Sequence, residues 1–164
     1  MTSELDLIQR LYAYNSRVRA KYLTAIWQLP PRERYRNRGA SFPSLVDIFL
    51  HVLDAYRVWF DEVYARGTTP DWYPLGARYT LAEARREMRA IDRRVLRVVG
   101  SLRPGDLNRR LPLPKAWRPR THIELRVLLV HMIEEELQHR GEMNALLWKA
   151  GRTPPVTGYD GERG

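Results

Sequence analysis

The chain has 164 residues, no cysteine and a formal net charge of +9. A chain of this length is expected to fold as one domain with a substantial core, here over residues 1–155, followed by a tail at 156–164. Without cysteine it has no disulfide, thiolate nucleophile or cysteine-based zinc site, so any metal ion must be held by His, Asp or Glu. The sequence has no run of 18 apolar residues, so no membrane span is expected. The first residues lack a signal-peptide pattern, so the expected location is cytoplasmic.

The positive charge comes almost entirely from arginine, which supplies 25 of the 28 basic residues. A balance this basic raises the question of a nucleic acid or an acidic partner. The arginines are scattered over segments such as "RERYRNR" and "RREMRAIDRRVLR", and no dense basic block is interleaved with stacking aromatics. We therefore interpret them as solvated faces and do not expect a nucleic-acid partner. A non-catalytic basic bundle that binds nucleic acid or an acidic partner is the alternative of a different class.

Four helices are predicted because the same start signal recurs along the chain. In each case a Ser or Thr is followed three residues later by an acid, which is the capping-box pattern. Pro or Gly then follows at a distance typical of a long helix. The pairs are Ser3 with Asp6, Ser44 with Asp47, Thr80 with Glu83, and Thr121 with Glu124. The predicted helices span residues 3–29, 44–66, 80–102 and 121–150.

Each predicted helix carries an apolar line at a spacing of three and four residues. Helices with such a stripe pack at small crossing angles, so the predicted fold is all-α, a four-helix bundle. The connections are longer than simple turns, so at least one of them can cross over the bundle. The segment "LNRRLPLPKAW", within the last connection, is predicted to form a short extended arm.

Polar residues interrupt the apolar line in two of the helices. His51 lies in the line of the second helix, and Glu135 and His139 lie one turn apart in the line of the fourth. An unpaired buried carboxylate costs several kcal/mol or becomes protonated, and a metal cation removes that cost. We therefore predict that these three residues bind a divalent metal, with other coordination positions open.

Structural interpretations of the same residues stay open. His51 also fits a hydrogen-bonded core histidine, and Glu135 with His139 fits a buried ion pair or a solvated face. Glu136 and Arg140 are interpreted as an ordinary surface pair at the i, i+4 spacing. His131 is interpreted as a wall residue or a partner behind the ligands. Asn15, in the line of the first helix, either fixes the register or hydrogen-bonds a ligand.

Three segments resemble the DinB/YfiT-like superfamily. "HMIEEELQHRGEMNALLWKAG" resembles its last helix, "SLVDIFLHVLDAYRVWF" its second helix and "LYAYNSRVRAKYLTAIWQLP" its first. The resemblance implies a bundle of up-down-down-up topology, a homodimer, and a divalent metal between the second and fourth helices. It places the ligands at His51, Glu135 and His139. The commonest pattern has three histidines, so Glu135 is a departure, shared with the mycothiol-dependent maleylpyruvate isomerases.

The activity that this resemblance implies centres on low-molecular-weight thiols. We expect a metal-dependent transferase that joins a thiol of the bacillithiol, mycothiol or glutathione type to an electrophile, or a thiol-dependent isomerase. Zinc or nickel is the expected metal, with manganese or iron as alternatives, because a carboxylate ligand makes the site less selective for zinc. Arg140 and Arg57 are candidates for holding the carboxylate of the thiol. Metal-assisted hydrolysis is the alternative, with Glu134 or Glu142 as the candidate base.

Overall fold

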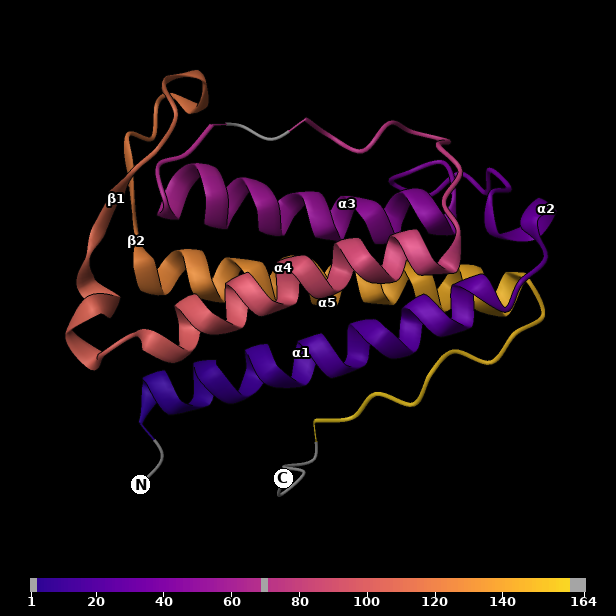
Figure 1. Cartoon of the computed structure of the whole chain (residues 1–164), viewed down its shortest axis with the longest axis horizontal. Helices are drawn as coiled ribbons and strands as arrows, with labels where there is room; N and C mark the ends of the chain where they lie inside the picture. The colour runs from indigo at the N-terminus through magenta and orange to yellow at the C-terminus, as the bar shows by residue number, and fades with distance from the viewer. Residues whose placement is uncertain (1–2, 69–70, 160–164) are drawn as a thin grey trace.

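The structure is a computed structural model that describes residues 3–68 and 71–159. In this part of the chain four long helices form a bundle, which confirms the predicted all-α fold (Figure 1). They are α1 (Glu4–Trp27), α3 (Leu45–Arg57), α4 (Leu81–Ser101) and α5 (Leu125–Lys149). A short helix, α2 (Pro31–Arg34), follows α1, and α3 continues as a π-helical segment, η1 (Val58–Tyr64). None of these helices is both long enough and apolar enough to cross a membrane.

Three of the four predicted helix starts are capped as expected. The hydroxyls of Ser3, Ser44 and Thr80 accept from the backbone N–H three residues on, and Thr80 forms a complete capping box with Glu83. The fourth prediction, Thr121 with Glu124, is wrong, because α5 begins after Glu124 and has no side-chain cap. The residues before α5 form a strand instead, and the first N–H of the helix, that of Leu125, donates to the Arg109 carbonyl at 2.9 Å.

The helices have the up-down-down-up order that the family resemblance implies. In Figure 1, α1 and α5 run in one direction and α3 and α4 run in the other. Packing joins α1 to α4 and α3 to α5, with further contacts between α1 and α5 and between α3 and α4. Two consecutive helices in the same direction require a long return, and the described parts of the connection from η1 to α4, residues 65–68 and 71–79, run along α3. This crossover forms one wall of the candidate site described below.

The connection between α4 and α5 forms the extended arm that the sequence predicts. Strand β1 (Arg110–Pro112) pairs antiparallel with β2 (His122–Glu124), with Leu111 opposite Ile123. Two short 3₁₀ turns flank β1, namely η2 (Pro104–Asn108) and η3 (Lys115–Trp117). Leu111 is buried, so the arm is attached to the end of the bundle by an apolar contact.

The segment after α5 turns back along α1 (Figure 1). The Tyr159 ring packs edge-on against the Tyr14 ring at a centroid distance of 5.2 Å, and Lys21 donates to the Val156 carbonyl at 3.4 Å. This part of the predicted tail therefore lies as a strap on the bundle. The remainder, residues 160–164, lies outside the described residues.

A buried network of charged groups connects all four helices. Arg19 of α1 donates to Glu136 of α5 at 2.7 Å and also pairs with Asp92 of α4. The Tyr56 hydroxyl of α3 donates to the same Glu136 oxygen at 2.7 Å, and the Arg19 guanidinium lies over the Tyr56 ring. Arg140 lies 3.5 Å from the other oxygen of Glu136. The interpretation of Glu136 and Arg140 as a surface pair is therefore wrong, since both are about 95% buried or more.

This network fixes how α5 is rotated about its axis. Glu136 and Arg140 face the centre of the bundle, so the preceding residues, Glu135 and His139, lie about 100° around the helix, toward α3. The buried charges balance, with two guanidinium groups against two carboxylates, which is the condition for tolerating ions in a core.

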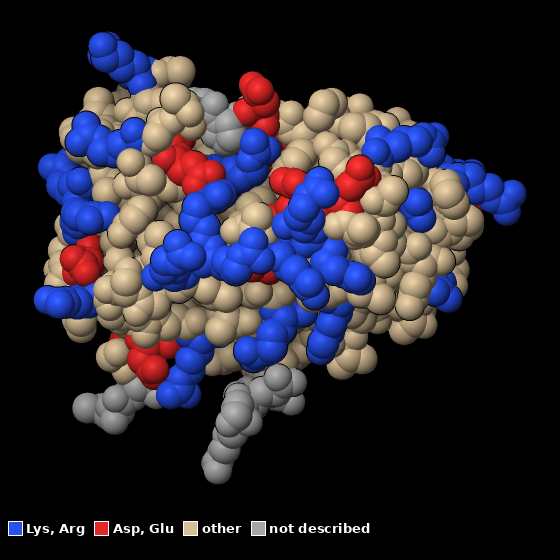
Figure 2. Space-filling view, in the orientation of Figure 1, with Lys and Arg blue, Asp and Glu red and all other residues tan. Residues whose placement is uncertain are grey.

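The surface shows that arginines scattered in the sequence gather in space. Figure 2 shows Lys and Arg side chains in a band across the face over α4, with acidic side chains mainly at its borders. Arginines that are scattered along the sequence therefore lie close together on this face of the folded protein.

Candidate metal centre

His51, Glu135 and His139 converge between α3 and α5. The Nε2 atoms of His51 and His139 lie 3.2 and 3.1 Å from the same carboxylate oxygen, Oε1 of Glu135. One ligand atom of each residue lies within 4.8 Å of the others. The i, i+4 spacing on α5 brings Glu135 and His139 to one face, and the adjacent antiparallel helix α3 brings His51 to them.

A second carboxylate orients the His139 ring. Nδ1 of His139 lies 2.8 Å from Oε2 of Glu142, and the Ser41 hydroxyl donates to the same oxygen at 2.6 Å. A carboxylate at Nδ1 holds a proton on that nitrogen, so Nε2, which faces Glu135, is the nitrogen that a metal ion would bind. This carboxylate–histidine arrangement is the usual support of a histidine that binds a metal.

The charges of the three central groups are strongly coupled. The hydrogen bond with His139, aided by that with His51, holds the pKa of Glu135 well below its usual value. The contact with Glu135 is also the main reason that the pKa of His139 is raised above 6.5, against the opposing effect of burial. For Glu142, burial favours the protonated form, but the hydrogen bonds with Ser41 and His139 outweigh it and lower its pKa. Glu135 is therefore an anion at neutral pH, and a proton competes for His139.

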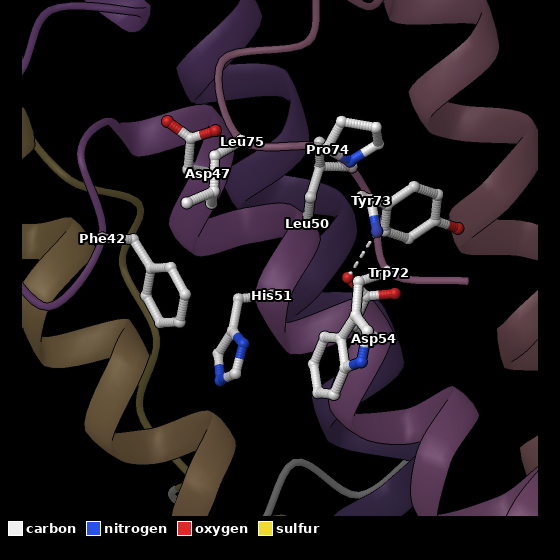
Figure 3. Close-up of a pocket in the computed structure, with 9 residues that line it drawn as sticks. All are labelled: Phe42, Asp47, Leu50, His51, Asp54, Trp72, Tyr73, Pro74 and Leu75. Carbon is white, nitrogen blue, oxygen red and sulfur yellow. Dashed lines mark hydrogen bonds between the residues drawn. The ribbon is translucent and has the colours of Figure 1, made fainter. Parts of the chain in front are cut away.

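Aromatic side chains flank His51 (Figure 3). The Phe42 ring stacks on the imidazole at a centroid distance of 4.1 Å, and the Trp72 indole lies nearly parallel to it at 6.2 Å. A pocket of about 290 Å³ opens beside His51. Its lining is mostly apolar and consists of Phe42, Leu50, Trp72, Tyr73, Pro74 and Leu75, with Asp47, His51 and Asp54 from α3. The three converging residues thus lie next to a pocket of small-molecule size.

Comparison with known proteins identifies the family of this chain. The model of the DinB family matches residues 1–163. The chain belongs to the DinB family. The crystal structure of a DinB-like protein, YjoA, from Bacillus subtilis is similar with a TM-score of 0.64, and the match covers 90% of this chain and 97% of that one. The identity is only 13%, so the likeness concerns the DinB fold alone. No curated protein matches the chain.

The acidic residues of the DinB pocket are occupied in holding the crossover. Asp54 accepts from the backbone N–H of Tyr73 at 2.9 Å, and Asp47 accepts from the N–H of Gly76 at 2.7 Å. Gly76 has a φ of 72°, a conformation that favours glycine. Arg57 donates to Asp54 at 2.8 Å and lies under the Tyr73 ring, so it supports the crossover. It is not among the residues that line the pocket.

The three residues predicted to lie behind the ligands or in the pocket are placed elsewhere. Arg140 is buried on the α1 side of α5 and donates to Asn15 at 2.9 Å. His131 packs edge-on against Trp59, two helical turns from His139, and lines a separate hollow. Asn15 and Arg140 therefore belong with the buried network, and the structure brings none of the three to His51.

Sequence reasoning missed the residues that complete this DinB site. Phe42 and Ser41 come from the loop before α3, and Trp72 comes from the crossover. Glu142 was noted only as a candidate base, although its position three residues after His139 on one helix was a usable signal.

The donor set of this DinB chain suits a divalent cation. Two imidazole nitrogens and one ionised carboxylate converge within 4.8 Å, and bonds of about 2.0–2.2 Å to a central ion require only small side-chain movements. A carboxylate oxygen already lies between the two nitrogens, and the support at Nδ1 of His139 has the correct polarity.

Proposed function

We propose that this DinB-family chain binds a divalent metal ion through His51, Glu135 and His139 and transfers a low-molecular-weight thiol to a small electrophile. The observation that supports this most directly is the convergence of the three donors beside an apolar pocket. The chain has no cysteine, so the sulfur must belong to a bound cofactor. A thiol-dependent isomerase would use the same metal ligands and the same pocket. It would differ in that the thiol is released unchanged after the substrate is isomerised.

The metal ion, the carboxylate behind His139 and the aromatic pocket walls each have a separate role in this proposal. A bound divalent ion would lower the pKa of a coordinated thiol so that a thiolate forms near neutral pH. Glu142 holds a proton at Nδ1 of His139 and thereby keeps the lone pair of Nε2 available to bind the metal ion. The aromatic rings of Phe42 and Trp72 on the pocket walls favour a flat, apolar electrophile.

The metal is proposed to be zinc or nickel, with manganese or iron as the alternatives. Two imidazoles favour the later transition metals, and the single carboxylate reduces the preference for zinc over harder ions.

Metal-assisted hydrolysis has less support because neither candidate base is available. Glu134 is exposed and lines the hollow beside His131, away from the three ligands. Glu142 is near the site, but its Oε2 atom already accepts a hydrogen bond from Ser41 and is hydrogen-bonded to Nδ1 of His139, so this oxygen is not free to act as a base.

The homodimer that the family resemblance implies also stays a proposal, supported by the outer face of α5. Four large apolar residues there are 48–62% exposed, and their spacing puts them on one stripe. They are Val127, Val130, Leu137 and Trp148. A second copy covering this stripe would bury it.

A thiol-consumption assay tests the proposed activity. With metal added, we expect the protein to conjugate monochlorobimane with glutathione, bacillithiol or mycothiol, each supplied in turn. Glu135→Ala should lower the rate by at least about 100-fold, the upper end of the loss seen when a group behind a metal ligand is removed. Glu134→Ala, one residue away and exposed, is the matched control and should stay within about twofold. A metal-loaded protein that consumes none of the three thiols contradicts the proposed activity and leaves the metal site standing.

Removing the carboxylate behind His139 should weaken metal binding without abolishing it. In Glu142→Gln the amide supplies a weaker, uncharged partner for Nδ1, so we expect the metal affinity to fall about 10- to 100-fold. Competition with a chromophoric chelator measures this affinity. An affinity within about twofold of the unchanged protein would show that Glu142 does not support the ligand.

Metal affinity and metal-free stability should depend on pH in opposite directions. Because the pKa of His139 is raised, a bound proton blocks Nε2 at low pH, so the affinity should rise from pH 6 to pH 8. Without metal, the raised pKa of His139 stabilises the folded state below about pH 6.5, and this contribution is lost as the pH rises through the raised pKa. The lowered pKa of Glu135 stabilises the folded state above about pH 4.5. Both contributions are therefore present between about pH 4.5 and 6.5, and the metal-free protein should lose stability above that range. Calorimetric titration and denaturant unfolding at each pH measure the two trends, and trends of the same sign would contradict this prediction.

A further inference from the structure

Four exposed arginines lie on one face of α4. They are Arg86, Arg89, Arg93 and Arg97, at offsets of three, seven and eleven residues. At 100° per residue these offsets place all four within about 80° of the helix circumference, over a length of about 16 Å. Figure 2 shows a band of basic side chains over α4, the helix that carries these four arginines. We call these four residues the α4 arginine row.

Most of this row lacks the acidic partners that other arginines of the chain have. Among the described residues, Arg89, Arg93 and Arg97 have no ion pair, and Arg86 has only a 3.5 Å contact with the adjacent Glu87. By contrast, Arg94, one position away and turned from the row, pairs with Asp61 at 2.7 Å. The charge of the row is therefore directed to solvent, where neighbouring like charges at this spacing repel one another. An anionic partner relieves that repulsion.

The side chains of the row favour phosphate as the anion. The planar guanidinium fork binds two phosphate oxygens at once and is less strongly hydrated than an ammonium group. Charges repeated every three or four residues over about 16 Å match a polymer that carries phosphates at regular intervals better than they match a single small anion.

The composition of α4 selects among phosphate-bearing partners. None of the exposed large hydrophobic residues of the described chain lies on α4, so this face has nothing to insert into a membrane. The helix contains no aromatic residue on which unpaired bases stack, which disfavours a single strand. The row repeats a single type of side chain and offers no pattern of different donors and acceptors with which to read a base sequence, so we expect recognition that is independent of sequence.

We infer that the α4 arginine row binds the phosphate backbone of double-stranded nucleic acid, independently of base sequence. This surface is separate from the candidate metal centre, because the ligands lie between α3 and α5 and the row lies on the outer face of α4. The two functions can therefore be tested one at a time.

The test compares two triple variants that remove the same charge. Arg89, Arg93 and Arg97 are changed to Gln in one, and Arg110, Lys115 and Arg118, exposed on the arm, are changed to Gln in the other. Binding to a random-sequence 30-base-pair DNA duplex, and to an RNA duplex, is measured by fluorescence anisotropy from 50 to 300 mM KCl. For four phosphate contacts the slope of log K against log salt is about −3.6, and the row variant should reduce it to about −1. Its affinity at 50 mM should fall about tenfold or more, while the arm variant stays within about twofold.

Three results would overturn the inference. The first is no binding to either duplex at 50 mM salt, and the second is an equal loss in both variants, which indicates net charge alone. The third is equally tight binding to vesicles of anionic phospholipid that the row variant also loses, which assigns the face to membrane surfaces. The circular dichroism spectrum and the thermal midpoint should be unchanged in both variants, which checks that the bundle is intact.

Discussion

In Glu135→Ala we expect the protein to lose its metal ion, with metal content falling from about one ion per chain to near zero. The carboxylate is the only anionic donor of the three and lies between the two imidazoles, so its removal takes away both a bond and the charge balance of the site. Elemental analysis of protein purified without a histidine tag or chelator measures this. Glu134→Ala should retain the ion.

The same variant should also lose the stability that metal binding adds. A ligand present at a thousand times its Kd stabilises the folded state by about 4 kcal/mol. Chelator should therefore lower the thermal midpoint of the unchanged protein by several degrees and leave that of Glu135→Ala in place. A metal-free protein with an unchanged midpoint in chelator would mean that His51, Glu135 and His139 only support the fold.

The second large effect is expected from Arg19→Met. This change leaves Glu136 and Asp92 without their shared cation in the core, and breaking a buried ion pair from one side costs about 3–5 kcal/mol. Methionine keeps much of the volume, so the loss reflects charge more than a cavity. Equilibrium denaturant unfolding measures the free energy of unfolding.

A matched control for this prediction lies on the same helix. Arg10 pairs with Asp6 at 3.2 Å on the surface, with 63% of its side chain exposed, and Arg10→Met should cost no more than about 0.5 kcal/mol. A loss below about 1 kcal/mol in Arg19→Met would contradict the view that this network stabilises the bundle.

Local signals in the sequence were sufficient for the helices and insufficient for their partners. Capping pairs and apolar periodicity locate α1, α4 and the continuous helix made of α3 and η1 to within a few residues, but they do not predict the change to π-helix at Val58. The start of α5 was misplaced because β2 pairs with β1, a contact that no local pattern reports. The i, i+4 spacing of Glu136 and Arg140 is typical of a surface pair. Because α5 has apolar residues on its exposed side and polar residues on its buried side, periodicity does not identify its buried face.

The sequence predicts the metal ligands of the candidate site but not the residues of its pocket. His51, Glu135 and His139 were found because polar residues interrupted an apolar line, which is a signal within single helices. Phe42 and Trp72 were not, since both come from irregular segments whose positions depend on the completed bundle. Side chains brought together by long connections carry no periodic signature, and the pocket is made mainly of such side chains.

The way the crossover is attached has a consequence for how this site diversifies. Asp47 and Asp54 hold it through the backbone N–H groups of Gly76 and Tyr73, and a backbone N–H is present whatever side chain a residue carries, proline excepted. The path of this segment is thus set by the bundle, while most of its side chains are free to change. Homologous chains can acquire a different substrate preference by substitutions at positions such as Trp72 and Leu75, with the donors on α3 and α5 left untouched.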